Sequence, residues 1–325
     1  MERRRLVGAG LAGLVLLPGA VRAQSSTRTP RIGFLNNLNP AVAAPNVEAF
    51  LQGLRERGWI DGRNVTIVYR WADGDMARHP AHALELAKLP VDVIVTAGTQ
   101  AVRAARQATT TIPIVVAIMP DPVGLGFAAS LARPGGNVTG LANVFEELTP
   151  KQLEVFREVV PGAKRIVLLT DRSTEDRILA VTEAAARALG LVPLTLDVKT
   201  PRDLDASMKT ARSERADGVL VLPSPFFNRY RARIADLAIA QRLPTISESA
   251  EYVVDGGLLS YGPNFPQMYF RAAAYVDRIL RGETAGNLPI ERPTTFELVV
   301  NEKTAKALAI VIPKGLLQRA DRVIR

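Results

Sequence analysis

The sequence contains no cysteine and only two histidines among its 325 residues. The absence of cysteine excludes disulfides, thiol catalysis, iron–sulfur clusters, cysteine-containing zinc sites and a lipid-modified N-terminal cysteine. His79 and His82 lie three residues apart in a predicted helix, with Asp75 nearby. Two histidines without a fixed third ligand do not make a metal centre, so we interpret them as surface side chains and predict no metal.

Signatures of catalysis are also missing. The chain has no G-x-S-x-G, Walker A or H-E-x-x-H pattern. Residues 8–13 match the dinucleotide fingerprint G-x-G-x-x-G, but they follow three arginines instead of a buried strand. The sequence therefore predicts a protein that is not an enzyme and binds no cofactor, with an exported α/β hydrolase or dehydrogenase as the alternative.

Long basic runs are absent although the formal net charge is +9. The basic residues are scattered singly and alternate with acids, as in Arg55-Glu56-Arg57. This spacing is typical of solvated helix faces and not of a phosphate-binding stripe. We therefore expect no nucleic-acid partner.

The first 23 residues have the layout of a secretory signal peptide. Arg3-Arg4-Arg5 is followed by an apolar stretch from Leu6 to Leu17, a Pro18-Gly19 break and small residues up to Ala23. The apolar stretch is too short to span a bilayer comfortably. We predict cleavage after about Ala23 and a periplasmic protein that is not a lipoprotein, exported by either the Sec or the twin-arginine route.

Short apolar strands alternate with helical stretches through the rest of the chain. The first half is predicted to contain strands at 31–35, 65–69, 91–95 and 112–117, and helices at 46–57, 79–88 and 99–108. After the turn-rich segment 133–137, strands are predicted at 165–169, 192–196, 218–222 and 244–246, and helices at 149–159, 174–189, 203–215 and 229–242. Continuous apolar strands separated by helices indicate parallel sheets covered on both faces. The predicted fold class is α/β, with two doubly wound parallel-sheet lobes.

The C-terminal part does not fit a simple chain of two lobes. Segment 256–262 is strand-like, 266–281 is an amphipathic helix and 296–300 is another strand. One helix and one strand left over are expected when the chain recrosses between lobes. We therefore assign residues 24–144 with about 263–290 to lobe 1, and 145–262 with about 291–325 to lobe 2.

Polar residues follow most of the predicted strands. Ligands of open parallel sheets bind at the carboxyl ends of the strands, where helix N-termini converge. Two lobes that face each other would bring these ends to one cleft. The candidate ligand-binding residues are Asn36, Asn37, Trp71, Thr96, Gly98, Thr99, Gln100, Met119, Asp121, Asp171, Ser173, Ser224, Phe226 and Glu248.

The candidates also have purely structural interpretations. Segment 98–100 opens a helix whose free N–H groups could hold a carboxylate, or Thr96 or Thr99 is simply its N-cap. Asp121, between two prolines, could present a carboxylate to an ammonium group or cap a turn. Glu248 could be a second acidic contact or could complement a helix dipole.

Ser224 lies between two prolines, next to Phe226 and Phe227. This segment could offer a hydroxyl group and an aromatic wall to a ligand. The alternative is that these phenylalanines pack into the core.

Several longer segments are specific enough to indicate a family. They are Tyr69-Arg70-Trp71-Ala72-Asp73-Gly74, Asp121-Pro122-Val123-Gly124, and the ranges 132–140, 256–263, 275–282 and 301–308. Through them the chain resembles the bacterial ABC-transporter solute-binding proteins of the tryptophan/aromatic-amino-acid-binding type, a branch of the periplasmic binding proteins with the type I fold. The resemblance implies two lobes joined by three crossovers, a monomer that closes on a small solute and delivers it to the transmembrane subunits of a permease.

The mechanism that we expect is ligand capture by hinge closure. For an α-amino acid, the expected partners are Thr99 or Ser224 for the carboxylate, Asp121 or Glu248 for the ammonium group, and Phe226 or Trp71 for the side chain. A purine, a sugar or a branched aliphatic acid as the solute, or a sensory role, remain alternatives.

Overall fold

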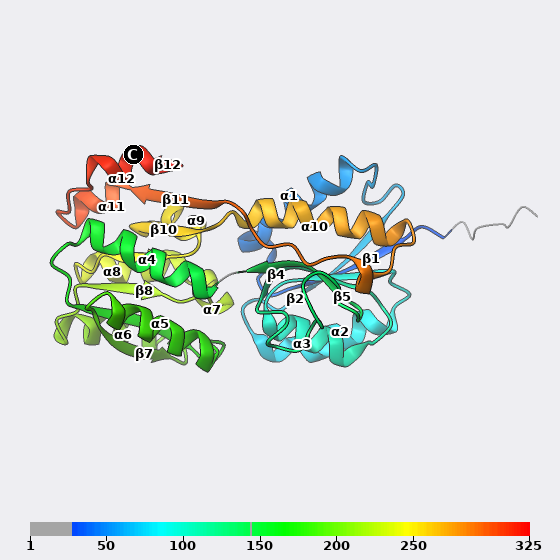
Figure 1. The fold of residues 1–325 in the computed structure, drawn as a ribbon, viewed down its shortest axis with the longest axis horizontal. Coiled ribbons are helices and arrows are strands. Elements are labelled where there is room, and N and C mark those ends of the chain that lie inside the picture. The colour runs from blue at the N-terminus through cyan, green and yellow to red at the C-terminus, as the bar shows by residue number, and fades with distance from the viewer. Residues whose placement is uncertain (1–27, 144) are drawn as a thin grey trace, which may run out of the picture.

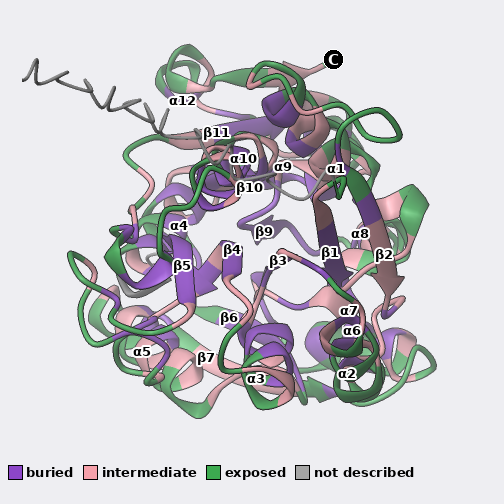
Figure 2. Ribbon diagram, turned by 90° about the vertical axis from the view of Figure 1, so that its right-hand side faces the viewer, coloured by how far each residue is buried: buried purple, intermediate pink, exposed green. Residues whose placement is uncertain are grey.

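The computed structural model describes residues 28–143 and 145–325, so the predicted signal peptide at 1–23 lies outside the described residues. Two α/β lobes lie side by side along the long axis of the molecule (Figure 1). A view along that axis shows the buried residues gathered in the strands and the exposed ones in the surrounding helices and loops (Figure 2). Within the described ranges, no helix is long and apolar enough to cross a membrane.

Lobe 1 is built on a five-stranded parallel sheet with the order β2-β1-β3-β4-β5. Its strands are β1 (Arg31–Asn36), β2 (Thr66–Trp71), β3 (Val93–Thr96), β4 (Ile114–Pro120) and β5 (Val138–Asn143). Its helices are α1 (Pro40–Arg55), η1 (Met76–Arg78), α2 (His79–Lys88), α3 (Thr99–Ala108), α10 (Phe265–Leu280) and η2 (Ala285–Asn287). Helices α1 and α10 share one apolar core with the sheet, and α2 and α3 share the other.

Lobe 2 is built on a seven-stranded sheet with the order β12-β11-β10-β9-β8-β6-β7. Its strands are β6 (Arg165–Asp171), β7 (Val192–Val198), β8 (Gly218–Val221), β9 (Thr245–Ser247), β10 (Leu259–Pro263), β11 (Phe296–Asn301) and β12 (Arg322–Ile324). Its helices are α4 (Phe145–Val159), α5 (Asp176–Ala188), α6 (Asp203–Ser213), α7 (Pro225–Arg229), α8 (Arg231–Ala240), α9 (Ala250–Val254), α11 (Glu302–Ala307) and α12 (Lys314–Arg319). One core packs under α4, α5 and α12, and the other under α6, α8 and α9.

The chain passes between the lobes three times. It crosses from β5 to α4, from β10 to α10, and from η2 to β11. Because β11 arrives from lobe 1, it runs antiparallel to β10, whereas the other neighbouring strands of both sheets are parallel. The predicted fold class, with two doubly wound lobes and three crossovers, is confirmed, and β11 is the exception to parallel pairing.

Some elements differ from the sequence prediction. Strand β5 was not predicted, because Gly140 interrupts its apolar pattern. Gly140 has a φ of +132°, and a Cβ there would lie 2.1 Å from the Val116 carbonyl oxygen, so close strand pairing requires glycine. Helix α1 begins at Pro40 and not at 46, because Asn39 caps it by accepting a hydrogen bond from the Val42 amide. The short elements α9, α11, α12 and β12 were not predicted either.

The interpretation of His79 as a surface side chain is wrong. His79 is 1% exposed, because it shares the buried face of α2 with Ala83 and Leu86, one and two turns further along. Burial lowers the pKa of His79 to about 4, with His82 adding to the effect. His79 is therefore a neutral core histidine.

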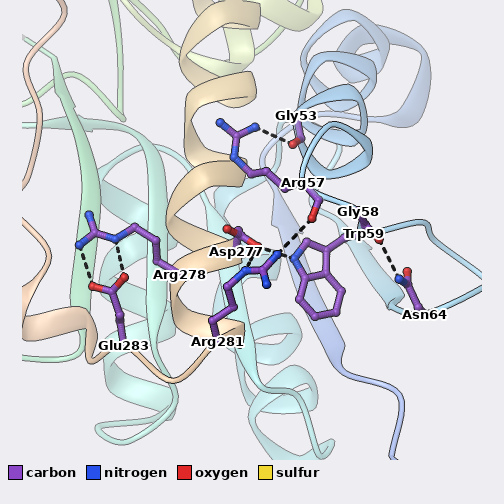
Figure 3. Close-up of polar contacts among 9 residues, drawn as sticks. All are labelled: Gly53, Arg57, Gly58, Trp59, Asn64, Asp277, Arg278, Arg281 and Glu283. Atoms are coloured by element: carbon purple, nitrogen blue, oxygen red, sulfur yellow. Dashed lines mark hydrogen bonds and ion pairs between the residues drawn. The ribbon is translucent and has the colours of Figure 1, made fainter.

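Helix α10, which returns from lobe 2, is fixed tightly to lobe 1. At Gly53 helix α1 approaches α10 so closely that a Cβ would lie 2.5 Å from the Phe270 carbonyl oxygen. The indole N–H of Trp59 donates to Asp277 at 2.8 Å, and Arg281 donates to the same carboxylate while lying over the Trp59 ring (Figure 3). These contacts fix the middle and the C-terminal end of α10 to lobe 1, and its N-terminal end, at Phe265, lies at the boundary between the lobes.

Candidate functional site

A cavity of about 140 Å³ lies between the lobes, at the carboxyl ends of their strands. We call it the central cavity. Lobe 1 contributes Asn36, Asn37, Leu38, Asn46, Met76, Ala97, Gly98, Thr99, Gln100, Ile118, Pro120, Phe265 and Tyr269. Lobe 2 contributes Ser173, Glu175, Ile178, Pro223, Ser224, Pro225, Asn228 and Glu248. The expectation that strand ends of both lobes meet at one cleft therefore holds for these residues.

Two further spaces adjoin the central cavity. The side pocket has a volume of about 410 Å³ and is lined by residues 120–125, Leu131, Ala142, Asn143, Glu147, Thr149, Glu175, Arg177, Ile178, Val181 and Arg292. The outer pocket has a volume of about 210 Å³ and is lined by residues 73–76, 171–173, 198–201, Phe226, Arg229 and Tyr230. The side pocket shares Pro120, Glu175 and Ile178 with the central cavity, and the outer pocket shares Met76 and Ser173.

The N-terminus of α3 opens onto the central cavity. Gly98 is its N-cap and provides no capping side chain, and the first amide bonded back to Gly98 is that of Val102 at 3.1 Å. The amides of residues 99–101 therefore have no intrahelical acceptor, and the positive end of the helix dipole adds to their attraction for an anion. Gly98 has a φ of +79°, and a Cβ there would lie 3.1 Å from the side-chain Nδ2 of Asn37. Glycine is therefore favoured at this position.

Three asparagines on the lobe 1 wall have unused polar atoms. Asn36 is 4% exposed and accepts a hydrogen bond from the Leu38 amide, but its Nδ2 has no partner among the described residues. Within the same ranges, the Oδ1 atoms of Asn37 and Asn46 also lack a partner. Because buried polar groups are normally hydrogen-bonded, these atoms indicate a polar ligand in the cavity.

Glu248 provides a buried carboxyl group on the lobe 2 wall. It is 8% exposed, and Asn143 of lobe 1 donates a long hydrogen bond to it at 3.4 Å. Burial, with a smaller contribution from Glu251, raises the pKa of Glu248 to about 8 against the opposing effect of Asn143. A carboxyl in this position ionises readily only when a cation comes beside it, so the site suits an ammonium group.

Asp171 positions two serines of the cavity wall without lining the cavity itself. It accepts hydrogen bonds from the Ser173 hydroxyl at 2.6 Å and from the Ser224 hydroxyl at 2.7 Å. Ser224 also accepts from the amides of Phe226 and Phe227, so it is the N-cap of α7. The capping interpretation therefore holds for Ser224, although the residue lies on the cavity wall.

Two of the predicted site residues of lobe 1, Thr96 and Met119, lie in its interior. The Thr96 hydroxyl donates to the Leu35 carbonyl at 2.9 Å, and the residue is not on the cavity wall. Met119 is buried in the core that α2 and α3 cover. Since successive side chains of a strand point to opposite faces, Ile118 and not Met119 reaches the cavity.

The aromatic candidates do not form the cavity wall. Trp71 stacks on Tyr69 with 5.3 Å between ring centroids, at the end of edge strand β2. Phe226 packs against Tyr230 at 4.9 Å and lines the outer pocket. The aromatic wall is instead formed by Phe265 and Tyr269, both buried on α10.

Phe265, Tyr269 and Asn46 line the cavity but were not predicted as site residues. All three are on helices, whereas the predicted residues follow the ends of strands. Phe265 and Tyr269 are four residues apart and so share one helix face. That spacing is visible in the sequence, but nothing local shows that this face meets the cleft.

Asp121 does not line the central cavity. One of its oxygens accepts a hydrogen bond from the Gly124 amide at 2.9 Å, as expected for an Asp that caps a turn. The other pairs with Arg177 of α5. Asp121 is therefore already engaged by a cation of the protein, and Glu248 is the better partner for a ligand ammonium group.

Among the described side chains, three ion pairs connect the lobes around the cavity. In each pair the aspartate belongs to lobe 1 and the arginine to lobe 2. They are Asp73 with Arg229 at 2.8 Å, Asp75 with Arg172 at 3.5 Å, and Asp121 with Arg177. The lobes thus meet through complementary charges, as in a closed conformation.

The described part of the chain contains no group of three His, Asp or Glu side chains placed to hold a metal ion. The polar groups of the central cavity are suited to hydrogen bonding and charge pairing. An anion fits the α3 terminus and Asn36, a cation fits Glu248, and Phe265 and Tyr269 provide apolar surface between the polar groups and the core.

Known proteins resemble this chain over most of its length. A family model described as ABC transporter substrate binding protein matches residues 39–324. A tyrosine-binding protein of Clostridioides difficile (strain R20291) is 23% identical over 322 residues, which cover 93% of this chain and 91% of the relative.

Two solved structures are also similar. A conserved domain protein from Vibrio cholerae has a TM-score of 0.85 at 26% identity, with 91% of this chain and 100% of that chain covered. The ABC domain of Streptococcus pneumonia in complex with L-Trp has a TM-score of 0.83 at 24% identity, with the same coverage.

Proposed function

Because the chain belongs to the family of ABC transporter substrate binding proteins, we propose that it captures an α-amino acid between its two lobes for an ABC importer. Members of this family bind a small-molecule solute and present it to the permease of the transporter; they are not enzymes. The proposal adds to this the chemical class of the solute.

The observation that carries the proposal is the pairing of two opposite polar sites in one cavity. Glu248, a buried carboxyl with a raised pKa, lines it from lobe 2. The start of α3, which has no side-chain cap, and the Nδ2 of Asn36, which has no partner within the described ranges, line it from lobe 1. An α-ammonium and an α-carboxylate group are complementary to these two sites.

The mechanism follows from the positions of the two sites on different lobes. A zwitterion that binds to both gains its full set of contacts only when the lobes are closed. Its binding free energy therefore shifts the open–closed equilibrium towards the closed state.

An aromatic amino acid is the solute that we favour. Phe265 and Tyr269 line the same cavity as the polar sites and offer apolar surface to the first atoms of the solute side chain. Two of the similar proteins, a tyrosine-binding protein and one in complex with L-Trp, support the same class. A purine or a sugar carries no ammonium group, and would leave Glu248 without a cation.

We also propose where the protein acts, in which oligomeric state, and which residues make up each lobe. The signal peptide at 1–23 is removed after about Ala23, and the mature protein acts as a monomer in the periplasm, without a lipid anchor. The lobes comprise residues 24–144 with about 263–290, and 145–262 with about 291–325.

Native mass spectrometry of protein purified without refolding, followed by a thermal-shift screen of the twenty amino acids, tests the proposal. A ligand that binds only the folded state raises the melting temperature. We expect a co-purified mass or a selective rise for Trp, Tyr or Phe. A rise with a sugar or a purine but with none of the amino acids would contradict the proposed solute class.

A further inference from the structure

The central cavity is too small for a whole aromatic amino acid. Its volume of about 140 Å³ is close to that of a cavity of about 150 Å³ that holds one benzene molecule. Pockets for small molecules usually measure about 300–1,000 Å³. An aromatic amino acid consists of a ring and a charged head group, so the central cavity can hold only one of the two.

The polar groups of the central cavity assign it to the head group. The start of α3, Asn36 and Glu248 all line the central cavity. Charged groups of the solute lose their hydrogen bonds to water on binding, and these residues replace them. The side chain of the solute must then leave through one of the adjoining spaces. The side pocket and the outer pocket both open between the lobes.

We propose that the side chain of the solute lies in the side pocket, which it enters between Pro120 and Ile178, and that this pocket determines which amino acids bind. The inference rests on the proposed function and goes beyond it by naming the specificity-determining residues. They are Leu125 and Leu131 of lobe 1, and Ile178 and Val181 of α5 in lobe 2.

The chemistry of the side pocket fits a large apolar side chain. Leucine, isoleucine, valine and proline side chains line it, and its volume of about 410 Å³ exceeds that of the central cavity. Four of the charged side chains around it are paired with each other, Asp121 with Arg177 and Glu147 with Arg292 at 2.6 Å. They therefore place little uncompensated charge beside an apolar group.

The outer pocket is less suitable for such a side chain. It is about half as large, at about 210 Å³, and its lining includes Asp73, Asp75, Arg172, Lys199 and Arg229. An apolar side chain there would remove water from charged groups without replacing their hydrogen bonds. The side pocket is thus favoured by both size and polarity.

The position of the side pocket also connects solute size to closure. Leu125 and Leu131 belong to lobe 1, whereas Ile178 and Val181 belong to lobe 2. A side chain that reaches both walls buries apolar surface only when the lobes are closed. Larger apolar amino acids should therefore bind more tightly than alanine.

Isothermal titration calorimetry of the mature chain and two variants with alanine, leucine and tryptophan tests the inference. Val181→Trp fills the side pocket, and Phe226→Trp adds bulk to the outer pocket as the matched control. We expect Val181→Trp to weaken tryptophan binding at least tenfold and alanine binding less than twofold. Phe226→Trp should change neither dissociation constant by more than twofold.

A loss of tryptophan binding in Phe226→Trp but not in Val181→Trp would overturn the inference and assign the side chain to the outer pocket. Equal losses for alanine and tryptophan in Val181→Trp would also overturn it. Val181→Ala, which carries no risk of overpacking, should raise the preference for tryptophan over leucine at least threefold, and an unchanged preference would contradict the inference. If the wild type binds no amino acid, the proposed function fails, and the inference with it.

Discussion

Burial separates Glu248 from the other carboxyl groups of the cleft. Asp73, Asp75 and Asp121 each pair with an arginine of the opposite lobe. Within the described residues, the one side-chain hydrogen bond to Glu248 is the long one from Asn143, and burial raises the pKa of Glu248. It is therefore the carboxyl group whose ionised form gains most from a cationic ligand.

Replacing Glu248 should selectively weaken amino-acid binding. Glu248→Gln keeps the size of the side chain and removes the charge. A hydrogen bond to a charged group contributes about 1.5–3 kcal/mol, so we expect the dissociation constant for tryptophan to rise about 10- to 150-fold. Isothermal titration calorimetry measures the change.

Two matched variants serve as controls for this experiment. Glu154→Gln and Glu214→Gln make the same substitution at exposed ion pairs of lobe 2, Lys151 with Glu154 and Arg165 with Glu214, away from the cavities. Both should change the dissociation constant by less than about threefold, as for exposed ion pairs. A larger loss in either control than in Glu248→Gln would place the ammonium group elsewhere.

The raised pKa of Glu248 predicts proton release on binding. Below a pH of about 8 the carboxyl is mostly protonated in the free protein, and an ammonium group favours its ionised form. Affinity should therefore rise with pH up to about 8. Calorimetry in buffers of different ionisation enthalpy should detect released protons at pH 6 to 7, on the order of one per ligand. Equal heats in all buffers would contradict the assignment.

The raised pKa of Glu248 increases ligand affinity as the pH rises, but it lowers the stability of the ligand-free protein over the same range. The folded-state pKa of about 8 lies above the ordinary value of 4.5, so the contribution of Glu248 is fully present below pH 4.5. It is lost as the pH rises towards 8, because the unfolded chain releases the proton first. In ligand-free Glu248→Gln, the free energy of unfolding measured between pH 4.5 and 8 should lack this part of its pH dependence.

Helix α3 was predicted with its observed bounds, 99–108, because its apolar period and the preceding glycine are local features. Strand β5 was missed because the reason for Gly140 is a contact with Val116 on the neighbouring strand. The aromatic wall was missed for a similar reason. Phe265 and Tyr269 reach the cleft only because α10 packs on α1. The two helices are more than 200 residues apart in the sequence, so the residues around Phe265 give no sign of this contact.

The contact between α1 and α10 should depend on Gly53. A Cβ at this position would lie 2.5 Å from the Phe270 carbonyl oxygen and 2.8 Å from the Ala273 Cβ. Overpacking of this kind costs about 1–3 kcal/mol, so Gly53→Ala should lower the midpoint of thermal unfolding. Gly315→Ala is the control, because no atom lies within 4 Å of its added Cβ and alanine favours helix formation. A Gly53→Ala protein as stable as the wild type would contradict this packing.

Complementary charges on the two lobes connect closure to ionic strength. The aspartates of the three ion pairs all belong to lobe 1 and the arginines all belong to lobe 2. The pairs are partly exposed, so each contributes about 0.2–1 kcal/mol and is screened by salt. Closure, and with it ligand affinity, should therefore weaken as salt is added.

The double variant Arg172→Gln/Arg229→Gln should separate this contribution from ligand contacts. At low salt we expect its affinity to be about two- to tenfold lower than that of the wild type, and at high salt the difference should vanish. Arg187→Gln, which removes an ion pair within α5, should have no effect. A loss that persists at high salt would show that these arginines act by another route than charge pairing between the lobes.

At the scale of the whole molecule, both lobes contribute to one cavity that recognises the two charged groups of an amino acid. The most direct test is a calorimetric titration of the mature wild-type chain with L-tryptophan, tryptamine and indole-3-propionate, which share the ring and differ in the head group. We predict that only tryptophan binds well, and that each analogue, lacking one charged group, binds at least tenfold more weakly. Equally tight binding of either analogue would contradict recognition of the zwitterion by Glu248 and the start of α3.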